Sequence, residues 1–147
     1  MEVEEARRRT EKLMAEHGLE GWTLKFTYSL VQGGCCHHAK KLITMSRQIT
    51  ELNEWAGVME DIALHEIAHA LAPVGAGHGP KWKAMALKVG ATPERCYPAS
   101  VKTPEGKWVA TCACPGRVFR RHRPPPARTP GYCLDCDQDL KFRKTLV

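Results

Sequence analysis

Apolar and polar residues alternate strictly over residues 22–30, which is the clearest short-range pattern in the chain. The apolar members of this alternation are Trp22, Leu24, Phe26, Tyr28 and Leu30. A period of two places these side chains on one face of a β-strand, so the pattern predicts a half-buried strand. The following Gln-Gly-Gly sequence predicts a turn, and a second strand is predicted over residues 39–46.

Three other stretches show the spacing of about 3.6 residues that is typical of amphipathic helices. They cover residues 3–17, residues 54–71 and residues 80–89. Asn53 is a suitable N-cap for the second helix, and Gly90 is a suitable end for the third. Strands and helices together predict an α+β fold.

The second predicted helix contains the sequence His65-Glu66-Ile67-Ala68-His69. Residues four apart lie on the same face of a helix, so His65 and His69 can each direct a ring nitrogen to one metal ion. Glu66 is then placed to act on a metal-bound water as a general base. The structural alternative is a core helix with ordinary buried histidines, but it does not predict a glutamate in an otherwise apolar run.

The residues that follow this helix cannot extend it comfortably. Pro73, Gly75, Gly77 and Gly79 interrupt the helical pattern, and His78 lies among them. We therefore expect His78 to return to the metal as a third ligand. Three protein ligands with one open position are the pattern of a catalytic zinc rather than a structural one.

Length and composition narrow the class of protein. A chain of 147 residues with 43% hydrophobic residues supports one domain and a small appendage, and no apolar run approaches the length of a membrane span. The highly charged N-terminus does not resemble a signal peptide, so we expect a cytoplasmic protein. In a reducing compartment, seven cysteines favour metal ligands or free thiols over disulfides.

The formal charge of +6 is distributed unevenly along the chain. Residues 1–100 contain twelve basic and twelve acidic residues, whereas residues 101–147 contain ten basic and four acidic ones. A neutral domain followed by a basic module predicts that the module contacts a polyanion. The Arg7-Arg8-Arg9 triplet has glutamate neighbours and is more typical of a solvated helix face.

Two close pairs of cysteines predict a second metal site, in the basic module. The pairs are Cys112-Ala-Cys114 and Cys133-Leu-Asp-Cys136, and eighteen residues separate them. Such pairs resemble the two knuckles of a zinc ribbon, in which four thiolates hold a structural zinc ion. A hairpin with almost no core depends on such an ion to fold.

A basic segment lies between the two cysteine pairs. Its candidate nucleic-acid-binding residues are Arg117, Phe119, Arg120, Arg121, Arg123 and Arg128. Guanidinium groups suit phosphates, and an aromatic ring can stack on an unpaired base. The segment therefore predicts contact with nucleic acid, whereas its proline run is also compatible with a simple linker.

The order of these features resembles the SprT-like zinc metalloproteases, the family that includes the DNA-dependent protease Spartan. The resemblance covers residues 3–142, and the sequences HEIAHA and GHG are its most specific part. The spacing from His69 to His78 is longer than in the metzincins and lacks their glycine, so the metzincins are the poorer match.

This resemblance implies a zincin-like metalloprotease domain over residues 1–100 and a zinc ribbon over residues 101–147. It implies one catalytic zinc on the three histidines, with Glu66 as acid and base, and one structural zinc on the four cysteines. The implied substrates are proteins bound or crosslinked to DNA, as in DNA–protein crosslink repair, with single-stranded or damaged DNA contacted by the basic module. The chain is similar to a minimal bacterial or phage member, for which we expect a cytoplasmic or nucleoid-associated monomer without membrane contact.

Several alternatives remain open at the level of sequence. The protein is also compatible with a nucleic-acid-binding module whose zinc sites are both structural, or with a zinc peptidase that has no nucleic-acid role. One of the two predicted strands is expected to be an edge strand that accepts an extended substrate. Adjacent side chains point apart, so Cys35-Cys36-His37-His38 is unsuited to one ion, although one of them can line a cleft. The candidates for the donor that stabilises an oxyanion are Tyr28, His37, His38 and Tyr97.

Overall fold

The computed structural model describes residues 1–114, 117–128 and 131–145. The fold is of the mixed α+β class, as predicted, and it divides into two compact units, Met1–Pro104 and Glu105–Val147. The division falls four residues after the boundary expected from the charge distribution. In the part of the chain that the structure describes, no helix is both long and apolar enough to cross a membrane.

A three-stranded sheet forms the centre of the first unit. The strands are β1 (Thr23–Thr27), β2 (Gly34–His37) and β3 (Leu42–Ser46), in the spatial order β1-β3-β2. β1 runs parallel to β3, whereas β2 runs antiparallel to it. β2 is therefore an edge strand, although the sequence places it in a connection between strands.

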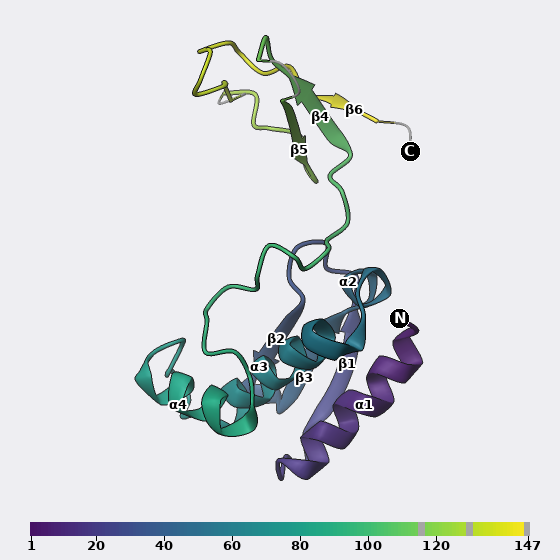
Figure 1. Ribbon diagram of the computed structural model, residues 1–147, viewed down its shortest axis with the longest axis vertical. Helices are drawn as coiled ribbons and strands as arrows, with labels where there is room; N and C mark the ends of the chain where they lie inside the picture. The colour runs from purple at the N-terminus through teal and green to yellow at the C-terminus, as the bar shows by residue number, and fades with distance from the viewer. Residues whose placement is uncertain (115–116, 129–130, 146–147) are drawn as a thin grey trace. The chain divides into compact units, whose positions relative to one another are not determined.

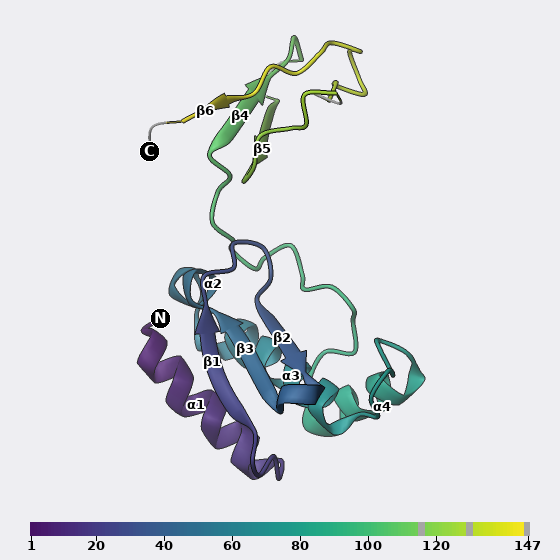
Figure 2. The ribbon, with the colours of Figure 1, turned by 180° about the vertical axis from the view of Figure 1, so that it is seen from behind.

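One face of this sheet packs against helices. Leu24 pairs with Ile43 and Phe26 with Met45, and these four side chains lie on the covered face. Helices α1 (Val3–Glu16) and α3 (Glu60–Leu71) contact each other on this side, as Figures 1 and 2 show. The predicted strand of residues 22–30 is too long, because β1 ends at Thr27 and the side chain of Tyr28 is 75% exposed.

The long helix predicted over residues 54–71 is interrupted. A short helix, α2 (Arg47–Leu52), comes first, and α3 begins only at Glu60. Gly57 lies between them with a φ of 75°, which breaks the helical hydrogen bonding. The prediction that Asn53 caps the long helix is wrong, because its side chain instead bonds Ile49 of α2 and Lys102.

The third helix agrees with the sequence. α4 (Pro80–Val89) begins with a proline and ends at Gly90, whose φ is 90°. Residues 91–104, which we name the strap, follow without helix or strand. The strap is held to the unit near both ends: the Thr92 backbone N–H donates to Asp61 Oδ1 at 2.7 Å, and Lys102 exchanges hydrogen bonds with Asn53.

The second unit is a small antiparallel sheet. Its strands are β4 (Trp108–Thr111), β5 (Val118–Arg121) and β6 (Arg143–Lys144), in the order β5-β4-β6. Among the described residues, its buried hydrophobic core consists of Ala110, Cys133 and Leu140. This core is too small to stabilise the unit alone, so another source of stability is needed.

Candidate active site and metal centres

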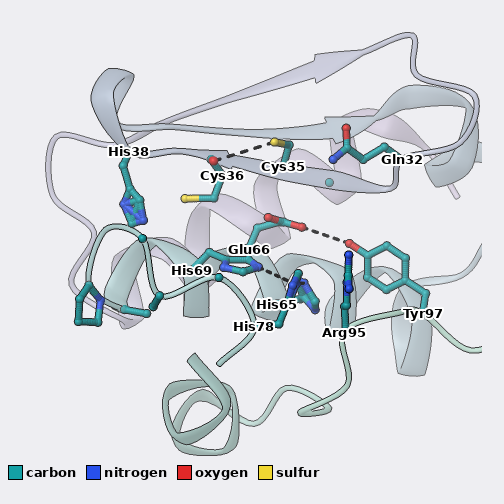
Figure 3. A pocket seen from close by; sticks show the side chains of 16 residues that line it. Gln32, Cys35, Cys36, His38, His65, Glu66, His69, His78, Arg95 and Tyr97 are labelled. Atoms are coloured by element: carbon teal, nitrogen blue, oxygen red, sulfur yellow. Dashed lines mark hydrogen bonds between the residues drawn. The ribbon is translucent and has the colours of Figure 1, made fainter. Parts of the chain in front are cut away.

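The three predicted histidine ligands meet in one place. His65 and His69 project from successive turns of α3, and His78 returns from the glycine-rich loop after that helix (Figure 3). Gly75 and Gly77 adopt φ values of 84° and 54°, which lets this loop reverse direction within a few residues.

The three ring nitrogens are placed as metal ligands. The Nε2 atoms of His65 and His69 each lie 3.1 Å from Nε2 of His78. One proton cannot satisfy three converging nitrogens, whereas ligands about 2.0–2.1 Å from a tetrahedral zinc lie about 3.3 Å apart. The donor set and the spacing therefore fit a zinc ion.

Burial favours the neutral form of the His65 and His69 imidazoles, which is the form that binds a metal. Burial, together with the neighbouring His69 and His78, lowers the pKa of His65 to about 4. Burial likewise lowers the pKa of His69 to about 4, with a further contribution from His78. Both rings are thus neutral near pH 7, which is the state that can ligate a cation.

Glu66 lies beside the histidines and is only 3% exposed. Its Oε1 atom accepts a hydrogen bond from the Tyr97 hydroxyl at 3.1 Å. Burial raises the pKa of Glu66 to about 7, and the hydrogen bond from Tyr97 opposes this increase. A carboxylate whose pKa lies near neutral pH is suited to accept and return a proton.

A cleft of about 410 Å³ opens over the histidines and Glu66 (Figure 3). Its far wall is formed by β2 through Gly34, Cys35 and Cys36. The sequence analysis expected one of its two predicted strands to be the edge strand that accepts a substrate beside the active-site helix, but neither of them lines this cleft. β3 is central and β1 forms the opposite edge, so β2 is the bordering strand.

Two of the four candidates for the donor that stabilises an oxyanion line the cleft. Tyr97 and His38 line it, whereas Tyr28 and His37 do not.

Burial and the negative charge of Glu66 raise the pKa of Cys36 to about 12, so its thiol stays protonated. Arg95, which sequence reasoning did not select, lines the cleft from the strap.

The four predicted cysteine ligands converge in the second unit. The sulfur atoms of Cys112, Cys114, Cys133 and Cys136 all lie within 4.8 Å of one another. The Sγ atoms of Cys114 and Cys133 are 3.9 Å apart, and sulfurs around a tetrahedral zinc at about 2.3 Å are about 3.8 Å apart. A disulfide needs about 2.05 Å, so the geometry fits a metal ion instead.

Two of the candidate nucleic-acid residues are ion-paired within the second unit. Arg117 pairs with Asp135, and Arg120 pairs with Glu105 at 3.5 Å. Their charges are therefore partly neutralised by carboxylates that lie outside the basic segment. Arg123 and Arg128 are exposed and follow β5.

An aromatic cavity lies beside these arginines. It has a volume of about 310 Å³, and its lining residues are Phe119, Arg120, Arg121, Gly131, Tyr132, Leu140 and Phe142. The guanidinium of Arg121 lies over the Phe142 ring, 5.7 Å from its centroid. Tyr132, which is 56% exposed, was missed because it is outside the basic segment that the sequence singles out.

The first unit thus combines a buried carboxylate with three converging imidazoles in an open cleft, the residue set of a mononuclear zinc hydrolase. The sequence model of the SprT-like family matches residues 4–103, and the chain belongs to this family. The family is associated with zinc metallopeptidase-like activity. No curated protein and no solved structure matches the chain.

Proposed function

We propose that this protein is a zinc-dependent endopeptidase of the SprT-like type that acts on DNA-associated or DNA-crosslinked proteins. The observation that carries the proposal is the convergence of three histidine Nε2 atoms beside Glu66 in an open cleft. A purely structural zinc site would have a fourth protein ligand and no need for a cleft.

The chain's own residues perform most of the proposed chemistry. His65, His69 and His78 would hold a zinc ion, which acidifies a bound water and polarises the scissile carbonyl. Glu66 accepts the proton of the attacking water and later delivers it to the leaving amine. Its burial supports this role, because burial raises the pKa of Glu66 in the metal-free site and so favours acceptance of a proton.

The edge strand gives this site a way to hold a peptide. β2 pairs with β3 on one side only, and it borders the cleft. An extended segment that adds to the free edge of β2 would pass directly over the histidines. Main-chain pairing of this kind requires an unfolded or flexible substrate segment, and it imposes little sequence preference.

The second unit supports contact with DNA less strongly. Three aromatic rings and Arg121 around one cavity are suited to stack an unpaired base beside a phosphate. The ion pairs of Arg117 and Arg120 reduce the charge available for phosphates and favour the alternative of a peptidase without a nucleic-acid role. We therefore expect recognition of single-stranded DNA to depend on stacking more than on charge.

The test is cleavage of a small DNA-binding protein, with unfolded casein as a substrate that does not bind DNA. The wild type and Glu66→Gln, purified identically and matched in zinc content, are compared with and without a single-stranded oligonucleotide. Glu66-dependent cleavage that DNA accelerates for the DNA-binding substrate supports the whole proposal.

The other outcomes separate the alternatives. Cleavage of both substrates that is indifferent to DNA retains the peptidase and removes the nucleic-acid role. DNA binding without any cleavage, in a preparation with full zinc content, favours a binding module with structural zinc sites. Equal cleavage by Glu66→Gln and the wild type, with contaminating proteases excluded, would overturn the assignment of Glu66 and the proposed peptidase.

A further inference from the structure

The side chain of Glu66 is enclosed from two sides by residues that do not belong to the set of metal ligands. On one side lies the backbone of β2 at Gly34, and on the other the ring and hydroxyl of Tyr97. Figure 3 shows the carboxylate between β2 and the Tyr97 ring, above the histidines.

Gly34 lies in van der Waals contact with the glutamate. A Cβ atom at this position would lie 2.7 Å from Glu66 Cγ and 3.1 Å from Oε1. The sequence interprets Gly33-Gly34 as turn residues, but neither has a positive φ. Glycine is needed at position 34 because the strand approaches α3 too closely for any side chain.

Gly33 makes a similar approach one turn earlier on α3. A Cβ there would lie 3.1 Å from Ile62 Cδ1 and 3.3 Å from Tyr97 Cε2. The two glycines thus face Ile62 and Glu66, which are four residues apart on one helical face. Because Gly33 has no side chain, the edge of the Tyr97 ring can lie close to the backbone at this position.

Tyr97 completes the enclosure. Its hydroxyl donates to Glu66 Oε1 at 3.1 Å, and its ring centroid lies 5.4 Å from that of His65. The strap that carries Tyr97 is fixed to Asp61 and Asn53, so the hydroxyl is presented by an anchored segment.

We propose that Tyr97 and the Gly33-Gly34 pair are positioning residues that hold the Glu66 carboxylate in one orientation. Oε1 is occupied by the Tyr97 hydroxyl, and Oε2 is left for proton transfer. A glutamate side chain has three rotatable bonds, so fixing it in advance removes an ordering cost from the reaction. The inference rests on the proposed peptidase function for its kinetic consequence, but the enclosure itself can be tested without activity.

The first measurement uses the metal-free protein and requires no turnover. Unfolding equilibrium constants are measured for a double-mutant cycle that consists of the wild type, Tyr97→Phe, Glu66→Leu and the double variant Tyr97→Phe/Glu66→Leu. Glu66→Gln is measured beside them. If the hydrogen bond is present in solution, Tyr97→Phe destabilises the wild type but not Glu66→Leu, with a coupling of about 3- to 20-fold in the unfolding constant. Additive effects would overturn the inference.

The second measurement is kinetic. Tyr97→Phe should lower kcat by about 10- to 100-fold while KM and zinc content remain close to those of the wild type. In a Glu66→Asp background, whose shorter side chain cannot reach the hydroxyl equally well, the same substitution should have a much smaller effect. Tyr28→Phe is the matched control, because Tyr28 is exposed and does not line the cleft.

The glycines provide a graded test. Gly34→Ala should reduce kcat strongly, because the new methyl group must displace Glu66 Cγ. Gly33→Ala should cost less, because its nearest neighbours are the ends of flexible or movable side chains. Wild-type kcat in both Tyr97→Phe and Gly34→Ala would overturn the inference even if the peptidase is confirmed. If the wild type cleaves nothing, the proposed function fails, and the unfolding cycle alone decides whether Glu66 is held.

Discussion

The indole of Trp82 lies nearly parallel to the imidazole of His69, with ring centroids 5.1 Å apart and an interplanar angle of 25°. The same indole lies 4.6 Å from the ring of His65 and 4.7 Å from that of His78. Trp82 is fully buried at the start of α4, so a single side chain packs against all three predicted metal ligands.

Substitution of Trp82 should therefore weaken metal binding without removing a ligand. We expect Trp82→Phe to reduce zinc affinity by about 10- to 100-fold, because the smaller ring leaves the imidazoles less firmly oriented. Competition with a chromophoric chelator measures this affinity. Trp22→Phe is the control, because the ring that Trp22 contacts is that of His38, with centroids 5.9 Å apart, and His38 is not one of the three ligands. Equal affinities in the two variants would contradict the prediction.

Replacing the general base should stabilise the metal-free protein at alkaline pH. Burial raises the pKa of Glu66 from 4.5 to about 7, so its folded state holds a proton more tightly than the unfolded chain. The corresponding stability is present below pH 4.5 and is lost as the pH rises through 7. Glu66→Gln avoids this loss, and we expect it to gain about 1–3 kcal/mol over the wild type at pH 8.

Urea denaturation at pH 8 and pH 4 tests this expectation. The difference between Glu66→Gln and the wild type should nearly disappear at pH 4, where Glu66 is protonated in both states. A difference that is independent of pH would show that Glu66 titrates as an ordinary surface carboxylate.

Loss of the cysteine site should unfold the second unit selectively. The buried hydrophobic core of that unit has only three members among the residues that the structure describes, and Cys133 is one of them. We expect Cys133→Ser to bind one zinc ion instead of two and to become sensitive to proteolysis within residues 105–147 only. Cys96→Ser is the control, because Cys96 is exposed and outside both metal clusters. A protease-resistant Cys133→Ser would mean that the metal is dispensable for this unit.

The aromatic cavity predicts which substitutions affect DNA binding. Tyr132→Ala should weaken binding of single-stranded DNA by about 1–3 kcal/mol, the cost of one stacked base. Arg121→Gln should reduce the salt dependence by about one phosphate contact, whereas Arg117→Gln should change it less because Asp135 already neutralises Arg117. Fluorescence anisotropy at several salt concentrations measures both effects, and equal effects of the two arginine substitutions would contradict this ranking.

The features that sequence reasoning predicted correctly depend on local signals. α1 and α4 have clear helical periods, and α4 is bounded by a proline and a glycine. The histidine and cysteine clusters could also be predicted from the sequence, because metal ligation requires a few residue types at characteristic spacings.

The features that were missed depend on contacts between distant residues. Asn53 has the properties of an N-cap, but its partner Lys102 lies 49 residues away and no local pattern indicates it. Gly34 resembles a turn glycine until its distance to Glu66 is known. The hydrogen bond from Tyr97 to Glu66 spans 31 residues, so no local pattern indicates it either.

The edge of β2 that pairs with no strand has a further consequence for self-association of the protein. A strand edge that can pair with any extended peptide can also pair with the same edge of another copy of the chain, which is how many proteins begin to aggregate. β2 is only four residues long, about 13 Å, and it is followed by Lys40 and Lys41. A short edge strand near lysine side chains limits pairing between copies of the chain. The same strand is still long enough to pair with a few residues of an extended substrate.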